Sequence, residues 1–372
     1  MTEDYGLMSI DFLVGFTIFM ITFIWVATLI PGLFIGLQSH TIDYDAVAYR
    51  TGVILVEDPG AVGPLVTGNQ PWEIQNDKRD VARFGLAVSK ETPRILDENK
   101  VNRFFCSTAF SYPEDYQKRV IFGDIPYRFN ISLLAVGEDT PRTVGDVVPD
   151  NYPYGYIRRD VKIKGSSNTT IGKTMIRAHG YNNTGNVTFN EFRIVINSSH
   201  LLTGDIGEIV NPNGDAAYRI NPNGDRIIIN ITDLDETRNK IAHPNTPNVN
   251  LSNVKFYQTH TGDSNLYAFS PVAAFENYVY VNWGTTAVKP PVDLGTDRNL
   301  SMIFEPGFFS STDKYGVIYI NLTFEIHDPT EIPDNGQQFL NNTHTRPFDY
   351  NYNHANVTQP ALTDAVMEVA VW

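Results

Sequence analysis

Residues 6–60 read GLMSIDFLVGFTIFMITFIWVATLIPGLFIGLQSHTIDYDAVAYRTGVILVEDPG, and this stretch decides how the chain is organised. From Phe12 to Leu37, 26 consecutive residues carry no charged side chain, and about 20 apolar residues are enough to cross a bilayer core. The residues that follow place an apolar stripe on one helical face, formed by Ile42, Ala46, Tyr49, Val53 and Val56. We therefore expect one helix from about Asp11 to Glu57. Its first half suits lipid or an apolar bundle, and its second half docks on a globular domain.

Two prolines mark this predicted helix. Asp58-Pro59-Gly60 ends it, because proline disfavours helical backbone at the preceding residue and glycine permits a reversal. Pro31 lies near the middle, where it removes a backbone hydrogen bond, crowds the preceding turn and is expected to kink the helix. Two interpretations of Pro31 stay open: a kink that serves assembly, or tolerance, since proline is commoner in membrane helices than in soluble ones.

The charge balance limits the partners of the chain. The 372 residues include 28 basic and 42 acidic side chains, for a net charge of −14. This balance argues against nucleic-acid binding, which needs basic surface, and against a partner made of anionic lipid. The single cysteine, Cys106, allows neither an intramolecular disulfide nor a cysteine-based zinc site. Its aromatic neighbours predict that Cys106 is a small buried residue.

A short polar leader precedes the apolar run. It ends at Gly6, the apolar run begins at Leu7, and Asp11 is the fifth residue counted from Leu7. This arrangement resembles the class III signal of type IV pilins, in which cleavage follows a glycine and bacterial members carry an acid at the fifth mature position. The resemblance implies a prepilin-type peptidase that cuts between Gly6 and Leu7. It also implies that Asp11 pairs with the new terminal amine of a neighbouring subunit; the alternative is a charge that favours the helix macrodipole at the water boundary.

The leader differs from the family pattern in its charge. Family leaders are typically basic, whereas this one carries Glu3 and Asp4 and has no lysine or arginine. The positive-inside rule therefore gives no orientation. The shortness of the leader favours an N-terminus inside the cell and residues 38–372 outside it.

Residues 60–145 are expected to form a small mixed α/β head. Its signs, in order, are Pro71-Trp72, Arg83-Phe84-Gly85-Leu86-Ala87, Ile95-Leu96, Lys100-Val101, a tyrosine-containing helix and the strand segment Phe129-Asn130-Ile131. This order resembles a group of archaeal pilin-like surface proteins, and the resemblance covers about residues 6–135. Trp72 and Phe84 are predicted to anchor the core of the head. Thr92 and Pro93 together predict the start of a helix.

Residues 146–372 are expected to form a large antiparallel β-rich domain, as a sandwich or two stacked sheets. In residues 317–326 the apolar side chains alternate with polar ones, which places them on opposite faces of a strand. Further strands are predicted at Glu191–Asn197, Arg226–Thr232, Tyr278–Trp283, Asn299–Phe304 and Ala365–Trp372.

One short motif occurs twice. Asn211-Pro-Asn-Gly-Asp215 recurs as Asn221-Pro-Asn-Gly-Asp225, ten residues further on. Asn-Gly is a strong hairpin-turn dipeptide, so we expect two tight turns that each reverse a short strand. A calcium site is the alternative, because these turns are rich in side-chain oxygens, but neither is followed by a bidentate glutamate at loop spacing.

Sequons for N-glycosylation are frequent. Eleven Asn-X-Ser/Thr sequences occur, at Asn130, Asn168, Asn182, Asn186, Asn197, Asn230, Asn250, Asn299, Asn321, Asn341 and Asn356. None lies in residues 1–60. In the five that fall clearly within predicted strands, the asparagine alternates with buried-type neighbours and is expected on the solvent face, where a glycan can stand. The alternative is that asparagines lie on the polar faces of strands simply because the chain is rich in asparagine, with no glycan attached.

No catalytic motif stands out. The eight histidines have no helical metal-ligand spacing, and there is no nucleophile elbow, P-loop or dinucleotide fingerprint. We therefore expect no cofactor, no metal and no enzymatic activity. A tethered extracellular hydrolase stays open as a minor alternative, because the acids of glycosidases need not be close in sequence.

The fold class expected is α+β, with a long kinked N-terminal helix, a small α/β head and a large sandwich-like domain. The expected parts are a leader (1–6), a membrane or assembly helix (7–59), the head (60–145) and an extracellular domain (146–372). The expected function is that of a structural subunit in a pilus-like surface assembly, in which residues 7–57 contact the membrane and copies of the chain or related pilin-like subunits. The alternative is a monomeric membrane-anchored adhesin that binds surface glycans.

Overall fold

The computed structural model describes most of the chain. The described residues are 10–37, 43–64, 71–75, 77–121, 125–151, 153–172, 191–203, 216–232, 234, 248–271, 275–294, 299–327 and 348–372. They belong to two compact units, Met1–Asp43 and Tyr44–Trp372. All the buried apolar side chains of the described residues lie in the second unit, from Val47 onward.

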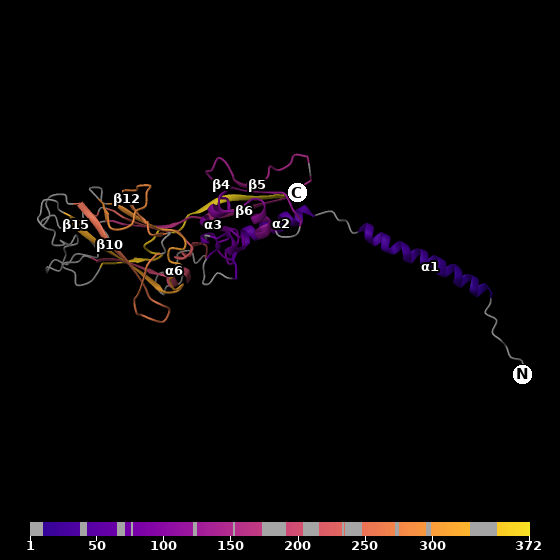
Figure 1. Ribbon diagram of the computed structural model, residues 1–372, viewed down its shortest axis with the longest axis horizontal. Helices are drawn as coiled ribbons and strands as arrows, with labels where there is room; N and C mark the ends of the chain where they lie inside the picture. The colour runs from indigo at the N-terminus through magenta and orange to yellow at the C-terminus, as the bar shows by residue number, and fades with distance from the viewer. Residues whose placement is uncertain are drawn as a thin grey trace, which may run out of the picture. The chain divides into compact units, whose positions relative to one another are not determined.

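The N-terminal region contains two helices. Helix α1 (Ile10–Leu37) lies in the first unit, and α2 (Tyr44–Glu57) begins the second (Figure 1). Asp43 is not helical, so the prediction of one unbroken helix is wrong. Aspartate is favoured just before a helix, because its carboxylate can accept hydrogen bonds from the free N–H groups of the first turn, which suits a new start at Tyr44. Pro31 lies inside α1, and the helix continues past it to Leu37.

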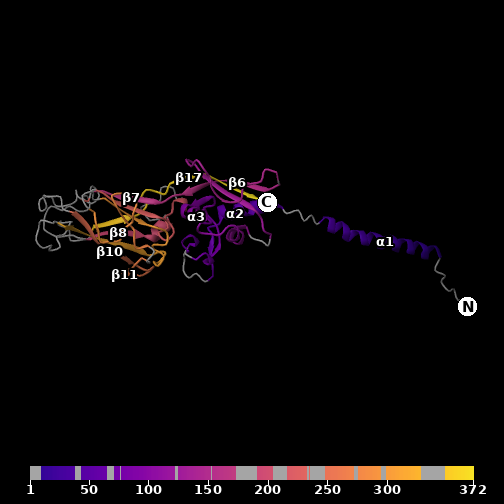
Figure 2. The ribbon, with the colours of Figure 1, turned by 45° about the horizontal axis from the view of Figure 1, so that its top comes forward.

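The head is built on a five-stranded sheet with the order β3-β6-β17-β4-β5. Its strands are β3 (Ile95–Asp97), β4 (Phe129–Ala135), β5 (Arg142–Gly145), β6 (Gly155–Lys164) and β17 (Leu362–Val371). Figure 2 shows β6 and β17 next to α2. The β3–β6 pair is parallel and the other neighbours are antiparallel. The α+β fold class expected from the sequence is confirmed.

The last strand of the chain forms the middle of this sheet. Strand β17 pairs with β6 from Leu362 to Val371 and with β4 from Ala365 to Val371. The head therefore extends beyond the expected boundary at residue 145, because β6 and β17 complete its sheet. The β-sandwich described below lies in the sequence between these two strands.

Helix α2 docks on the sheet through aliphatic side chains, with a glycine at the point of close approach. Its buried positions are Val47, Ala48, Thr51, Gly52, Leu55 and Val56. A Cβ atom on Gly52 would lie 2.9 Å from the Ile157 side chain, and one on Gly155 would lie 2.0 Å from the carbonyl oxygen of Tyr44. Both glycines thus permit a close approach of helix and strand that a larger residue would block.

The docked face differs from the predicted apolar stripe. Ala46 and Tyr49 were expected to face the domain, but both are exposed. The Tyr49 ring lies under the guanidinium of Arg159, with the Arg159 Cζ 5.2 Å from the ring centroid. The predicted stripe is confirmed at Val56, which is buried, and Val53 is half-buried. It is wrong at Ala46 and Tyr49, because the docked face is centred on Ala48, Thr51, Gly52 and Leu55. Ile42 lies outside the described residues.

Aromatic side chains fill the core of the head. Trp72 and Phe84 are 1% and 0% exposed, their ring centroids lie 5.2 Å apart, and Trp72 Nε1 donates to the Gly85 carbonyl at 2.9 Å. Their predicted role as core anchors is confirmed. Phe104 and Tyr116 extend the same cluster with ring centroids 5.2 Å apart.

The predicted helix start at Thr92 and Pro93 is wrong. The next helix, α3 (Glu98–Phe104), begins after β3, and its cap is Asp97. The Asp97 carboxylate accepts hydrogen bonds from the backbone N–H groups of Asn99 and Lys100 at 2.9 and 3.2 Å. A turn at residues 89–92 precedes β3 instead, closed by the Thr92 N–H on the Ser89 carbonyl at 3.3 Å.

The β-rich domain consists of two sheets. One has the order β12-β14-β9-β7, and the other has the order β11-β10-β15-β8-β16 with β13 paired to β10. The strands are β7 (Ser167–Ile171), β8 (Glu191–Asn197), β9 (Ile227–Ile231), β10 (Asn248–Gln258), β11 (Tyr267–Phe269), β12 (Val279–Val281), β13 (Val292–Asp293), β14 (Leu300–Phe304), β15 (Val317–His327) and β16 (Phe348–Tyr352). Both sheets contribute to one hydrophobic core, as in a sandwich.

Most strand predictions are confirmed. Each predicted strand of the β-rich region overlaps an observed one: β8, β9, β12, β14, β15 and β17. Pairing is mostly antiparallel, as expected, but β7 runs parallel to β9 and β16 runs parallel to β8. Hydroxyl groups join the two sheets: Ser167 Oγ lies 2.6 Å from Tyr352 Oη, and Thr169 Oγ1 lies 2.5 Å from Tyr350 Oη.

Short elements complete the described chain. They are β1 (Ala61–Val62) paired with β2 (Val81–Arg83), α4 (Glu114–Tyr116) with the π-helical turn Gln117–Ile121, α6 (Ser198–Thr203), and 3-10 turns at Trp72–Ile74, Lys78–Asp80 and Ala216–Tyr218.

A buried ion pair joins the head to the sandwich. Lys164 Nζ, at the end of β6, lies 2.7 Å from Asp225 Oδ2, and the two side chains are 2% and 7% exposed. Asp225 belongs to the second Asn-Pro-Asn-Gly-Asp motif, and its carboxylate also accepts from the Asn221 N–H at 2.9 Å. The motif forms a turn, as predicted, but a 3-10 turn precedes it, so it reverses no strand. Because Asp225 is already paired with lysine, calcium binding by this turn has no support. The first motif lies outside the described residues.

Removing the buried lysine should destabilise the second unit. We expect Lys164→Met to lower the free energy of unfolding by about 3–5 kcal/mol, because Asp225 is left buried without its counter-charge. The matched control is Lys162→Met on the same strand, whose ion pair with Asp364 spans 2.6 Å with side chains 48% and 68% exposed. Chemical denaturation of both variants checks the difference, and an equal loss in the two would contradict a special role for the buried pair.

Candidate functional site

Helix α1 exposes apolar side chains around its whole circumference. The exposed large apolar residues are Phe12, Leu13, Val14, Phe16, Ile18, Phe19, Met20, Ile21, Phe23, Ile24, Trp25 and Val26. Residues 11–28 form a span long enough and apolar enough to cross a membrane, and no other helix among the described residues meets that test. An apolar surface on all sides of a helix suits lipid or a helix bundle, whereas an amphipathic helix has one polar face.

The polar groups within this span are satisfied by the helix itself. The hydroxyls of Thr17, Thr22 and Thr28 donate to the carbonyls of Leu13, Ile18 and Trp25 at 2.7, 2.8 and 2.8 Å. Such back-bonding removes the need for water, which is the condition for a helix in an apolar environment. Asp11 lies in the first turn of α1, at the end of the span, and is exposed.

The processing site lies mostly outside the described residues. Gly6 and Leu7 precede the first described residue, and the side chain of Pro31 is not described. Cleavage after Gly6, the partner of Asp11 and a kink at Pro31 therefore stay predictions.

The sequons lie on the strand faces that the sequence predicted. Five asparagines, at positions 130, 197, 230, 299 and 321, are half-buried, and the apolar neighbours that alternate with them are almost fully buried. Asn168 and Asn250 are also half-buried, and Asn356 is exposed. Asn182, Asn186 and Asn341 lie outside the described residues. The alternation is confirmed; glycosylation itself stays a prediction, and Asn356 is the described sequon that is most open to it.

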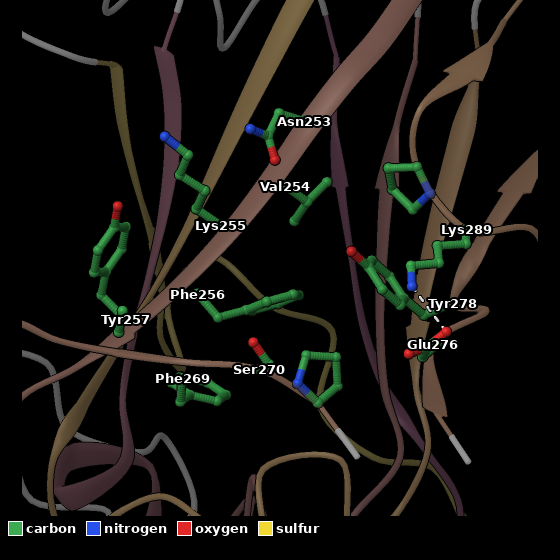
Figure 3. Close-up of a pocket in the computed structure, with 13 residues that line it drawn as sticks. Asn253, Val254, Lys255, Phe256, Tyr257, Phe269, Ser270, Glu276, Tyr278 and Lys289 are labelled. Atoms are coloured by element: carbon green, nitrogen blue, oxygen red, sulfur yellow. Dashed lines mark hydrogen bonds and ion pairs between the residues drawn. The ribbon is translucent and has the colours of Figure 1, made fainter. Parts of the chain in front are cut away.

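A cavity of about 420 Å³ opens on the sandwich next to β10 (Figure 3). Phe256, Phe269 and Tyr278 line it, and Phe256 lies 5.6 Å from each of the other two ring centroids. An ion pair of 2.8 Å between Lys289 Nζ and Glu276 Oε2 lies beside it. Because these rings pack on one another as part of the core, their presence in this cavity needs no ligand.

A second cavity, of about 520 Å³, lies where the head meets the sandwich. Glu73 and Arg103 line it from the head, and Arg226 and Glu305 line it from the sandwich, with Arg226 Nη2 donating to Glu305 Oε1 at 2.8 Å. The Glu73 oxygen Oε2 is buried and has no hydrogen-bond partner among the described residues. Burial raises the pKa of Glu73 to about 8; the positive charge of Lys100 opposes this rise, and the negative charge of Asp97 adds to it. Burial therefore favours the protonated form of Glu73.

Another cavity, of about 570 Å³, lies on the four-stranded sheet. The side chains that line it on the strands are Asn168, Ile228, Asn230, Tyr280, Ser301 and Ile303. The turn after β12 contributes Trp283, which is 57% exposed. Alternation predicted Trp283 only as the end of a strand. Its place in an Asn-Trp-Gly sequence was the signal that could have indicated an exposed turn.

The groups capable of acid–base or metal chemistry are scattered. Among the described residues, no cluster of three or more His, Cys, Asp and Glu side chains is placed to hold a metal ion. His354 is buried, and the rings of His260 and Tyr267 are tilted at 47° with centroids 4.7 Å apart. Cys106 is half-buried, with its sulfur 3.2 Å from Thr108 Oγ1, so the prediction that it is a buried core residue is wrong.

The chain is similar to an uncharacterized protein of Archaeoglobus fulgidus. The two are 45% identical over 155 residues, which cover 40% of this chain and 80% of that protein. No protein-family model matches the chain, and no solved structure matches it. The similarity places the chain beside an archaeal protein and assigns no activity.

The buried carboxyl of Glu73 predicts a pH-dependent stability. Its pKa is about 8 in the folded chain, against an ordinary value of 4.5. Between these values the folded state holds a proton that the unfolded state has lost, so the free energy of unfolding falls as pH rises, by at most about 1.4 kcal/mol per pH unit. Above the folded pKa the loss is complete.

We expect Glu73→Gln to remove this loss, because glutamine has the same shape and no charge. Denaturant titrations at pH 5 and pH 8 should therefore show a smaller fall for the variant than for the wild type. The matched control, Glu114→Gln at an exposed position, should keep the wild-type difference. Identical pH profiles for Glu73→Gln and the wild type would contradict a protonated Glu73.

Proposed function

The chain belongs to one family with an uncharacterized protein of Archaeoglobus fulgidus, and we propose that it is a structural subunit of a pilus-like assembly on an archaeal cell surface. Its N-terminal helix anchors the chain in the membrane and then packs against the helices of other subunits. The head and the sandwich are displayed outside the cell. The assembly carries out no reaction.

The observation that carries this proposal is the uniformly apolar surface of α1. Side chains on all sides of it are exposed, with Ile21 and Trp25 at 64% and 65%. Covering such a helix stabilises it by about 25 cal/mol for each Å² of apolar surface removed from water. Lipid and a bundle of like helices both provide that cover, so one segment can serve first as a membrane anchor and later as a filament core.

The head supports the same proposal. A short helix, α2, follows the apolar segment in sequence and packs on one face of a mostly antiparallel sheet. This order, an apolar helix and then a helix docked on a sheet, matches the pilin-like resemblance of residues 6–135. The sequons lie beyond residue 60, in the part that the proposal places outside the cell.

A membrane-anchored adhesin is the second candidate. The cavity beside Trp283 favours it, because an exposed tryptophan next to amide side chains is suited to binding a ligand. The two candidates differ in the fate of the leader: a pilin-like subunit loses it before assembly, and a monomeric anchor keeps it.

Mass spectrometry of the surface-exposed chain tests the proposed function. We expect an N-terminus at Leu7 in the wild type and an intact Met1 in Gly6→Leu, because a bulky residue before the cut would block the peptidase. Gly15→Leu is the matched control within α1, where a Cβ atom would meet nothing within 4 Å; it should leave cleavage unchanged. Wild-type chains that reach the surface with Met1 intact would contradict a pilin-like subunit.

A further inference from the structure

Trp283 occupies a backbone position that disfavours tryptophan. It lies in a turn closed by the Gly284 N–H on the Val281 carbonyl at 2.9 Å, and the two central residues, Asn282 and Trp283, have φ angles of 51° and 59°. Both values belong to the left-handed region, where glycine and asparagine are favoured and other residues are disfavoured. The turn itself therefore gives no reason for a tryptophan.

Packing gives no reason either. The Trp283 side chain is 57% exposed, and no ring of another described residue stacks on it. The core rings of the sandwich differ in both respects: Phe304 and Phe308 are 1% and 2% exposed, with ring centroids 4.7 Å apart. An indole that is more than half exposed and held in an unfavourable backbone conformation points to contact with something outside the fold.

The cavity beside Trp283 lies on the outer face of the four-stranded sheet, whose strands β12 and β7 are labelled in Figures 1 and 2. In the sheet register, Asn230 is opposite Ser301, and Ser301 is opposite Tyr280. In the next outward-facing row, Ile228 is opposite Asn168 on one side and Ile303 on the other. The residues between these on β9 point into the core, since Ile227, Ile229 and Ile231 are fully buried. The strand residues form the floor of the cavity. Ile228 and Ile303 give this floor an apolar strip, and Asn230, Ser301 and Tyr280 give it a row of hydroxyl and amide groups.

The polar groups of the floor are partly satisfied and carry little net charge. Ser301 Oγ donates to Asn230 Oδ1 at 2.7 Å, which leaves the amide nitrogen of Asn230 without a partner among the described residues. Arg226, at one end, is paired with Glu305 at 2.8 Å. The open donors and acceptors therefore suit a neutral ligand that is rich in hydroxyl groups.

We propose that this cavity binds a neutral pyranose. The apolar face of the sugar ring stacks on Trp283, and its hydroxyls form hydrogen bonds with the amide side chains of Asn168 and Asn230. A pyranose has a flat face of C–H groups and a rim of hydroxyls, which matches the indole and the amides. The volume, about 570 Å³, accommodates a small saccharide. This binding does not depend on the proposed assembly and would accompany an adhesin equally well.

Two sources can supply this sugar. Asn168 and Asn230 line the cavity and are themselves sequon asparagines, so a glycan on either one can fold back onto Trp283. The other source is a saccharide of another surface. The chemistry at Trp283 is the same in both cases, and the experiment separates them by the host in which the chain is made.

In the first arm, the full chain is made in a bacterial host without N-glycosylation, held in detergent and applied to a glycan array of neutral hexoses and N-acetylhexosamines. We expect binding by the wild type, an affinity about tenfold lower for Trp283→Gly, and an intermediate affinity for Trp283→Phe, because glycine removes the stacking ring and phenylalanine keeps a smaller one. The matched control is Tyr315→Ser, which removes another exposed ring, 47% exposed, from a turn outside the cavity. It should bind as the wild type does.

The thermal stability of Trp283→Gly shows whether weak binding to the array comes from a lost contact or from misfolding. Glycine is favoured at a left-handed position, so Trp283→Gly should unfold at the same temperature as the wild type or at a higher one. Weak binding by a variant that is at least as stable as the wild type cannot be attributed to misfolding.

In the second arm, the chain is made in an N-glycosylating archaeal host, and hydroxyl-radical footprinting reads the oxidation of Trp283 by mass spectrometry. If the sugar is carried by the chain, Trp283 is protected in the wild type. It becomes oxidised in Thr170→Ala with Thr232→Ala, which removes both sequons and keeps both asparagines.

Array binding that depends on Trp283 supports the proposal with a sugar from elsewhere. Protection that depends on the sequons supports it with the chain's own glycan. The proposal is overturned if Trp283→Gly binds the array as well as the wild type does. It is also overturned if the wild type neither binds the array nor protects Trp283.

Discussion

The second unit depends on the placement of its last strand. Strand β17 lies between β6 and β4, and helix α2 docks on the sheet that these strands form. Helix α2 and strand β6 approach closely because Gly52 and Gly155 have no side chains at their contact. The sheet of the head is therefore incomplete without residues 362–371, which form its central strand. The sandwich lies in the sequence between β6 and β17, so both chain segments that lead to it start from the same sheet of the head. The buried ion pair of Lys164 and Asp225 adds a further contact between the head and the sandwich.

This arrangement separates the tasks that the proposals assign. Between residues 11 and 28, α1 exposes apolar side chains on all sides, which suits lipid or other helices better than water. The head begins with α2 and contributes a sheet whose central strand holds the C-terminus. The sandwich carries two of the three cavities described above and most of the sequons, so recognition of other molecules can vary there without changing α1.

The sequence predicted the strands in which apolar and polar residues alternate regularly. It missed strands in which packing interrupts that alternation. Strands β8 and β15 alternate cleanly and were found. Strand β10 was missed because a bulge between Leu251 and Asn253 shifts its inward residues from one phase to the other. Strand β7 was missed because it buries hydroxyls, Ser167 and Thr169, that are satisfied by tyrosines of the opposite sheet.

The candidate sites follow the same rule. The apolar span and the sequon phase were readable from composition and alternation. The protonated Glu73 and the cavity beside Trp283 depend on contacts between distant segments, which no local pattern encodes.

The central claim, that α1 exchanges lipid for copies of itself, is tested most directly by helical reconstruction of filaments sheared from cells that produce the chain. The account predicts a filament core built from packed α1 helices, with heads and sandwiches outside it. Cells that carry the chain only as separate membrane-bound monomers, with no filament containing it, would contradict the account.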